Sequence, residues 1–333
     1  MNAVSVVIPT RNRPDFVVRA VNSVVAQSLS DIEIIVVVDG DDGKTAPALE
    51  AVRDPRLRVF VLPENRGASA ARNFGVSKAA ASWIAFLDDD DEMLPERLAV
   101  QHAAAGRSRA KYPLILCRSY VQTLTGKYIE PKVLPKEGEH ISEYMLNRAS
   151  IFGHVGGIGS SIMFTRKSLL TCIKFPKLKR HQDWSWALQA NAVKGFKFEF
   201  VPEPLCIYHT KHHVAGSISS ISSRNDWEWS RSWANRYREY MTGRAYSSFL
   251  LTTAAAMAKR QADWRAIPIL LGDSFAQGKP NLTHLFLFLG VWLLPIDAQA
   301  LVRDMRHRLR PLALWRREPD RPSGGLNKPA HRA

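Results

Sequence analysis

Short apolar segments alternate with segments of helical pattern through the first third of the chain. Consecutive aliphatic and β-branched residues occupy 4–8, 32–38, 58–62 and 83–87. Apolar residues on successive positions are typical of strands that are buried on both faces of a sheet. Helical patterns lie between them at 14–28, 46–53 and 68–80. The alternation predicts right-handed crossovers and an α/β fold with a mostly parallel central sheet flanked by helices.

The pattern is less regular after residue 110. We expect a helix at 184–193 and short strands at 114–118, 161–165, 197–201 and 205–208. Residues 216–295 have helical character, and a tail containing Pro and Gly ends the chain. We therefore divide the chain into an α/β half at 1–110, a second half of the same domain at 111–220, a helical C-terminal extension at 221–318 and a disordered tail at 319–333.

Charge is distributed unevenly along the 333 residues. The net charge is +15, from 46 Lys and Arg against 31 Asp and Glu. Residues 1–110 carry 13 basic and 15 acidic side chains, whereas residues 111–333 carry 33 and 16. An acidic half repels phosphate unless a metal ion is present, which argues against nucleic acid as a partner. The basic half favours an anionic membrane surface or an anionic substrate.

Cysteines and apolar runs indicate the compartment. The three cysteines, Cys117, Cys172 and Cys206, form no CxxC pair, which excludes a cysteine zinc site and suits a reducing compartment. The N-terminal apolar run has no basic region before it, so we interpret it as a strand and not a signal peptide. The longest apolar stretch, 285–296, is shorter than the roughly 20 residues of a membrane-spanning helix. We expect a cytoplasmic protein.

Polar residues follow three of the predicted strands. The first strand ends in Pro9, Thr10 and Arg11, the second in Asp39, and the fourth in four aspartates at 88–91. In such sheets the ligand lies at the carboxyl ends of the strands. Adjacent carboxylates raise one another's pKa, and hard oxygen ligands suit Mg²⁺ or Mn²⁺. The alternative is an exposed acidic loop, but two acidic runs at the ends of strands in one sheet favour a metal and diphosphate site.

Four segments resemble a known family: VSVVIPTRNRPDFVVRAVNSVVAQS, IEIIVVVDGDDGKT, ENRGASAARNFGVSKAAASWIAFLDDDDEMLPERL and, later, HQDWSWALQANAVKGFKFEFVPEPL. In order and spacing they are similar to the inverting family 2 glycosyltransferases of the GT-A fold. The resemblance implies that residues 1–110 bind a nucleotide-sugar and that residues 111–220 bind the acceptor and hold the catalytic base. It implies transfer of a sugar from a nucleotide-diphosphate donor, expected to be a UDP-sugar, to a glycan or lipid-linked glycan acceptor.

The resemblance also implies roles for single residues. The nucleotide donor is expected at Pro9, Thr10, Arg11, Asp39, Arg72, Asp88 and Asp89, and the metal ion at Asp88 and Asp90. Asp183 falls on the family's late acidic motif, and the resemblance implies that it is the catalytic base. The chain departs from the family pattern at Val38, where an aspartate is usual, and at Gln182, where a glutamate is usual. Arg11 replaces an aromatic residue that often stacks on uracil, although a guanidinium also stacks on a base.

The reaction itself requires a group such as Asp183. In a single displacement, the acceptor hydroxyl must lose its proton as it attacks the anomeric carbon opposite the leaving diphosphate, and a positioned carboxylate accepts that proton. The alternative role for Asp183 is an N-cap of a helix that starts at Trp184. Trp184 is a candidate wall of the acceptor site, with a core position as its alternative.

Two further candidates lie outside these motifs. His213, with His209 and His212 beside it, follows a predicted strand from which related enzymes sometimes supply a metal ligand; the alternative is a surface or core histidine. Gly157 stands in a glycine-rich run that lacks the Lys-Ser/Thr of a phosphate loop. We expect the acceptor to approach the backbone there.

The end of the chain favours a membrane surface. The apolar stretch 285–296 is followed by six arginines between 303 and 317, and an apolar wedge beside a cationic face is what a helix on anionic lipid needs. We expect a peripheral position on the inner face of the cytoplasmic membrane; the alternative is a helical hairpin that covers the sheet. Two other functions compete: a metal-dependent nucleotidyltransferase, and a non-catalytic polyanion-binding protein.

Overall fold

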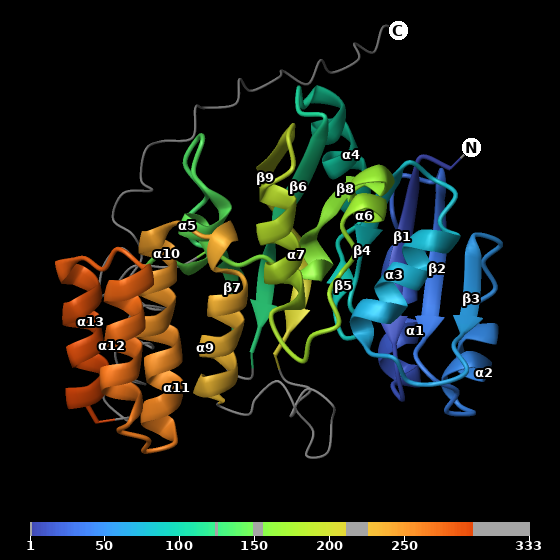
Figure 1. Ribbon diagram of the computed structural model, residues 1–333. Coiled ribbons are helices and arrows are strands. Elements are labelled where there is room, and N and C mark those ends of the chain that lie inside the picture. The colour runs from blue at the N-terminus through green and yellow to red at the C-terminus, as the bar shows by residue number, and fades with distance from the viewer. Residues whose placement is uncertain (1, 124–125, 149–155, 211–225, 296–333) are drawn as a thin grey trace, which may run out of the picture. The chain divides into compact units, whose positions relative to one another are not determined.

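Nine strands within the described residues, which are 2–123, 126–148, 156–210 and 226–295, form one sheet in the computed structural model (Figure 1). Their order is β3-β2-β1-β4-β8-β6-β9-β5, and β7 pairs with β6. Most of the paired residues are in parallel ladders, as the sequence predicts. The antiparallel pairs involve the short strands β5, β7 and β8.

The first half of the sheet follows the predicted alternation. Its strands are β1 (Val4–Thr10), β2 (Ile32–Val38), β3 (Leu57–Val61) and β4 (Trp83–Phe86), all parallel. Its helices are α1 (Pro14–Val25), α2 (Thr45–Glu50) and α3 (Ala68–Lys78). Every residue of β1 and β2 is buried, which explains their unbroken apolar runs. The chain moves from β1 to β2 to β3 in one direction across the sheet, and the connection from β3 to β4 runs in the other direction. With right-handed crossovers, α3 therefore lies on the face opposite α1 and α2.

The second half differs in detail from the prediction. It contains β5 (Glu92–Met93), α4 (Arg97–Arg107), β6 (Tyr112–Gln122), β7 (Lys127–Glu130), α5 (Ile141–Leu146), the 3₁₀ turn η1 (Ser160–Ile162), β8 (Phe164–Arg166), α6 (Lys167–Cys172), α7 (Gln182–Asn191) and β9 (Phe196–His209). The two strands predicted at 197–201 and 205–208 are one strand, β9, with a register shift against β6. The strand predicted at 161–165 begins as η1, and only its end pairs in the sheet.

Helices make up the rest of the described chain. They are α9 (Trp227–Arg236), η2 (Arg238–Tyr240), α10 (Gly243–Ser248), the π-helical segment η3 (Phe249–Ala254), α11 (Ala255–Arg260), α12 (Ala266–Gln277) and α13 (Leu282–Leu293) (Figure 1). Residues 1–293 form one compact unit, so these helices belong to the same unit as the sheet. The predicted helical extension is confirmed for 226–293. The disordered tail predicted at 319–333 lies outside the described residues.

No helix among the described residues is both long enough and apolar enough to cross a membrane. The longest apolar run of the sequence begins inside α13, which has 12 residues.

Candidate functional site

The ends of β1, β2 and β4 meet at one edge of the sheet, as the sequence predicts. The backbone N–H of Asp39 donates to the carbonyl of Thr10 (2.9 Å), which joins the ends of β2 and β1. The Asp39 carboxylate is buried and accepts from the N–H groups of Arg66 and Gly67, both at 2.7 Å. Asp39 therefore holds the loop that leads into α3. Pro9 and Thr10 end β1 with buried side chains, and Arg11 follows, half-buried.

The four aspartates after β4 point alternately outward and inward. Asp88 and Asp90 expose 32% and 27% of their side chains, whereas Asp89 exposes 9%. Asp89 accepts from the Thr10 hydroxyl (2.8 Å) and from Arg13 (3.0 Å), and Arg13 also donates to Asp90 (3.0 Å). Asp91 is buried and accepts from the Ser161 hydroxyl. Asp88 and Asp90 are thus the two carboxylates that face outward, two residues apart.

The aspartate run carries more negative charge than its arginines neutralise. Burial raises the pKa of Asp89 to about 6 although Arg13 opposes this, and the neighbouring carboxylates add to the rise. Burial and the charge of Asp88 raise the pKa of Asp90, and the same causes raise that of Asp91 well above its usual range. A divalent cation at Asp88 and Asp90 would offset this repulsion, so the residues fit a hard cation.

Within the described part of the chain, no group of three or more His, Cys, Asp and Glu side chains is gathered as a metal site. His213 and His212 lie outside the described residues. His209 is described: its backbone N–H donates to Asp91 (3.3 Å) and its ring lies 2.7 Å from Glu92.

Arg72 and Ser160 connect Asp88 to Asp183. The Arg72 guanidinium is buried and donates to Asp88 (2.6 Å) and to the Ser160 hydroxyl (2.8 Å), and its Nη1 lies 4.0 Å from Asp183. The Ser160 hydroxyl donates to Asp88 (2.8 Å), and its backbone N–H donates to Asp183 (3.2 Å). Gln182 accepts from Arg72 (3.2 Å). Two carboxylates separated by 95 positions in the numbering therefore share one set of donors.

These contacts affect the two carboxyl groups in opposite ways. Burial alone would raise the pKa of Asp88, but the charge of Arg72 and the hydroxyls of Ser160 and Ser161 outweigh it and lower the pKa. For Asp183 burial dominates and raises the pKa, since Arg72 offsets only part of it. Asp183 Oδ1 is buried and has no hydrogen-bond partner among the described residues. The Asp183 side chain as a whole is 24% exposed, so part of the carboxyl side chain is open to a bound hydroxyl group.

Asp183 does not have the alternative role of an N-cap. Helix α7 begins at Gln182, and His181 precedes it in a left-handed conformation (φ 57°). Asp183 lies in the first turn, and its carboxylate accepts from Ser160 rather than from its own helix.

An aromatic cluster packs behind this helix start. The His181 ring stacks on Trp184 at 4.6 Å and lies 4.5 Å from Trp233 of α9. Burial lowers the pKa of His181 to about 3, so the ring is neutral at physiological pH. Trp184 is therefore half-buried against His181 rather than open on all sides, and Trp186 is fully buried in the core. Gly157 is exposed.

Sequence reasoning missed the residues that connect the predicted ones. Ser160 lies in the glycine-rich run where we expect the acceptor to approach, and Arg13 follows the first strand without a recognisable motif. The signal for Arg13 was its place at a strand end beside the aspartates. Nothing in the pattern indicated Ser160, because its partners are 72 and 23 positions away.

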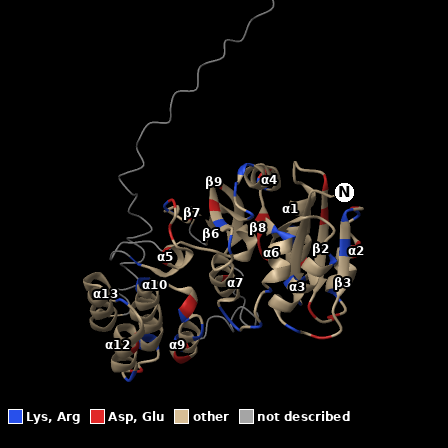
Figure 2. Cartoon of the chain, turned by 45° about the horizontal axis from the view of Figure 1, so that its top comes forward, with Lys and Arg blue, Asp and Glu red and all other residues tan. Residues whose placement is uncertain are grey.

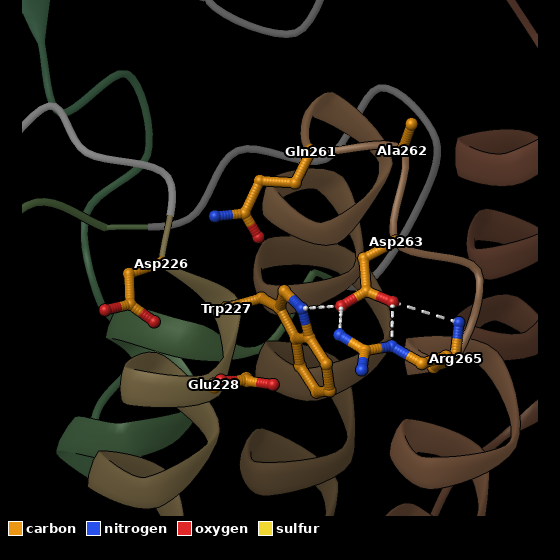
Figure 3. A pocket seen from close by; sticks show the side chains of 7 residues that line it. All are labelled: Asp226, Trp227, Glu228, Gln261, Ala262, Asp263 and Arg265. Atoms are coloured by element: carbon orange, nitrogen blue, oxygen red, sulfur yellow. Dashed lines mark hydrogen bonds and ion pairs between the residues drawn. The ribbon is translucent and has the colours of Figure 1, made fainter.

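One hollow of about 500 Å³ lies elsewhere, on the helical extension (Figure 3). It lies between the start of α9 and the turn from α11 to α12. The Trp227 indole N–H and the Arg265 guanidinium both donate to Asp263 there. None of the predicted site residues lines this hollow.

The fold and the strand-end cluster define a class: α/β enzymes of the GT-A-like type, with polar side chains at the carboxyl ends of a mostly parallel sheet and helices at the C-terminus. Residues 5–173 match the family model of glycosyl transferase family 2, and the chain belongs to that family. It is therefore a glycosyltransferase, which decides against the nucleotidyltransferase and polyanion-binding alternatives.

Curated relatives share different lengths of the chain. The succinoglycan biosynthesis protein ExoO of Rhizobium meliloti is 41% identical over 95 residues, 28% of this chain and 27% of ExoO. The amylovoran biosynthesis glycosyltransferase AmsB of Erwinia amylovora is 29% identical over 216 residues, 62% of this chain and 69% of AmsB. WcaA of Escherichia coli, whose name assigns it to colanic acid biosynthesis, is 26% identical over 279 residues, 80% of this chain and 92% of WcaA.

Solved structures agree on the fold. The crystal structure of S. aureus TarS 1-349 covers 83% of this chain and 92% of its own, with a TM-score of 0.52 and 17% identity. The same protein in complex with UDP-GlcNAc covers 84% and 93%, with a TM-score of 0.52 and 15% identity. At these identities the likeness concerns the fold alone.

Proposed function

We propose that this glycosyltransferase transfers a sugar, with inversion, from a nucleotide-diphosphate donor to a glycan or lipid-linked glycan during exopolysaccharide biosynthesis. The names of ExoO, AmsB and WcaA support the pathway class. A UDP-sugar is the proposed donor, supported by the TarS complex with UDP-GlcNAc. The proposed place of action is the inner face of the cytoplasmic membrane.

One observation supports the mechanism most directly. Asp88 and Asp183 both contact Ser160 and lie within reach of Arg72, yet Asp183 Oδ1 is buried without a hydrogen-bond partner among the described residues. The proposed donor-binding carboxylate and the proposed base are therefore held in one cluster. In an inverting displacement these two groups act on the same sugar from different sides.

Each residue then has a defined task. Pro9, Thr10 and Asp39 border the nucleobase, with Arg11 beside them. Arg72 stabilises negative charge on the departing diphosphate. Asp183 accepts the proton of the acceptor hydroxyl group. At the same time the hydroxyl oxygen forms a bond to the anomeric carbon, and the bond from that carbon to the diphosphate breaks.

A divalent cation completes the donor site in this proposal. Asp88 and Asp90, the two outward carboxylates, would hold Mg²⁺ or Mn²⁺, which when bound supplies positive charge to the leaving diphosphate. Trp184 and Gly157 are the proposed acceptor contacts. His213 stays a proposed metal ligand outside the described residues.

The substitution Asp183→Asn tests the base. It keeps the size of the side chain but removes its basicity, so we expect transfer to fall by about 10³-fold, within the range for general-base catalysis. The affinity for UDP and Mn²⁺, measured by calorimetry, is expected to stay within about twofold, because Asp183 makes no contact with the diphosphate in this mechanism.

Asp31→Asn is the matched control. Asp31 is exposed at the start of β2, at the opposite end of the strand from Asp39, and its replacement should leave transfer unchanged. Normal transfer by a folded Asp183→Asn protein would exclude Asp183 as the base.

A further inference from the structure

Helix α13 has an unpartnered apolar side. It contains no charged residue, and its exposed large side chains are Leu282 (86% exposed), Phe286 (60%), Leu289 (54%) and Leu293 (77%). Their spacing of four, three and four positions places them on one side of the helix. The other side, with Leu287, Phe288 and Trp292, is buried. We call the four exposed residues the α13 stripe.

Helix α12 also carries exposed apolar side chains. Phe275 is 61% exposed and Ile269 is 36% exposed. The only charged residue of α12, Asp273, is paired with Arg231 of α9. Figure 2 shows both helices almost free of charged residues. Several large apolar side chains exposed on one side of a helix, as in the α13 stripe, mark an interaction site, unlike single exposed side chains.

Aromatic and basic groups lie at the C-terminal end of the α13 stripe. Trp264 is 57% exposed and packs on Trp292 with ring centroids 5.1 Å apart. Lys259 donates to the carbonyl of Trp292, and its ammonium lies 5.5 Å from the Trp264 ring. Tryptophan and lysine at one end of an apolar surface are typical of groups that lie at lipid headgroups.

The charge of the chain distinguishes between occupants. Residues 296–333, which follow α13, contain nine Lys and Arg against four Asp and Glu. The chain as a whole has a net charge of +15, so a second copy would carry the same excess of positive charge, and like charges repel. An anionic lipid surface attracts basic residues that lie near it, each by about 1 kcal/mol. Charge complementarity therefore favours lipid.

We propose that α13 lies in the interface of an anionic lipid bilayer, with its stripe among the acyl chains and Lys259 and Trp264 at the headgroups. This inference names the lipid partner of the proposed function and rests on that function for its role in the cell. The surface is on the helical extension and not at the strand ends, so each can be tested without the other.

Vesicle co-sedimentation of the 333-residue chain tests the proposal. We expect binding to vesicles of phosphatidylcholine mixed with phosphatidylglycerol, and at least about tenfold weaker binding to phosphatidylcholine alone. The double substitution Phe286→Ser and Leu289→Ser should weaken binding to the mixed vesicles by about tenfold or more, because two apolar side chains no longer enter the lipid. Both residues are exposed, so the variant keeps its core.

Val133→Ser is the matched control, since Val133 is 54% exposed in the loop after β7, far along the chain from the stripe. It should bind the mixed vesicles as the parent does.

Equal vesicle binding by the double variant and the parent overturns the proposal. A dimer in sedimentation velocity that the double variant converts to a monomer, without vesicle binding by the parent, also overturns it and identifies the stripe as a self-association surface. UDP binding by the same proteins reports on the donor site separately.

Discussion

Single buried charges are stabilised here by several donors at once, and Glu33 is the clearest case away from the site. Its carboxylate is buried in β2 and accepts from the Ser5 hydroxyl (2.6 Å), from Arg58 (2.8 Å) and from the N–H groups of Ala80 and Ala81. Burial alone would raise its pKa, but these donors outweigh it and lower the pKa. Glu33 thus ties β2 to the loop before β4.

We expect Glu33→Gln to destabilise the protein by about 2 kcal/mol at pH 7, since the donors then face a neutral oxygen. The folded-state pKa is below the unfolded one, so the stabilisation is present above the unfolded pKa of about 4.3 and is lost as the pH falls through the folded value. Thermal melting between pH 7 and pH 3 should therefore show a difference from the parent that shrinks on acidification. The exposed Glu50→Gln should show none. A pH-independent difference would contradict the ionic origin.

At the same scale, the sequence located the chemically distinctive site residues but not their connections. Asp88 and Asp183 could be proposed because acidic residues after a strand or in a family motif are recognisable in one dimension. Ser160 and Arg13 could not, since a serine or arginine takes its role from partners that only the folded chain brings close. The alternating exposure of Asp88, Asp89 and Asp90 also depends on the backbone after β4.

Among the elements, α3 approaches the sheet closely through a glycine. A Cβ on Gly75 would lie 2.4 Å from Val7 Cγ1 and 3.3 Å from Val37 Cγ2, both on fully buried strands. The helix that follows the loop held by Asp39 thus packs directly on β1 and β2, which positions Arg72 one turn earlier in the same helix.

The substitution Gly75→Ala should destabilise the protein by about 1–3 kcal/mol. The free-energy cost of packing an added methyl group into the core exceeds the gain of about 1 kcal/mol in helix propensity. Gly106→Ala in α4 makes the same chemical change with no atom within 4 Å of the new Cβ, so it should be neutral or stabilising. Urea denaturation of both variants checks this. Equal stability of the two would show that α3 moves away from the sheet at no cost.

Elements were predictable where one physical signal dominated. Strands buried on both faces leave unbroken apolar runs, so β1 to β4 were located to within a residue or two at most ends. Helix α4 was missed, because it buries Arg97 and Gln101: Arg97 donates to the Phe86 carbonyl and Gln101 to those of Ile115 and Ile162. Polar side chains that pair with backbone inside the core cannot be distinguished from surface residues in a sequence.

At the scale of the whole molecule, the helical extension is connected to the half of the chain that contains α7. The Trp233 indole of α9 donates to the Ser185 hydroxyl of α7 (2.8 Å) and packs against His181. Ser185 is two positions after Asp183, so the first turn of α7 has the sheet on one side and the extension on the other. An interaction surface on α12 and α13 therefore belongs to the same compact unit as the proposed base.

Ligand binding should stabilise this unit as a whole, which makes thermal melting a test of the donor site. If UDP and Mn²⁺ bind together at about 100 times their dissociation constant, the folded state gains about 2.7 kcal/mol. That raises the melting temperature by about 5 °C for a unit of this size. We expect UDP to raise the melting temperature more than GDP or dTDP does, and to do so only when the metal ion is present.

Asp90→Ala should abolish the metal-dependent shift in melting temperature. Without ligand, the variant should melt near the temperature of the parent, because the substitution removes a carboxylate whose pKa is raised by burial and by Asp88. Asp31→Ala, remote from the carboxyl ends of the strands, should retain the full shift. An unchanged shift in the Asp90→Ala protein would mean that the outward carboxylates do not hold the cation.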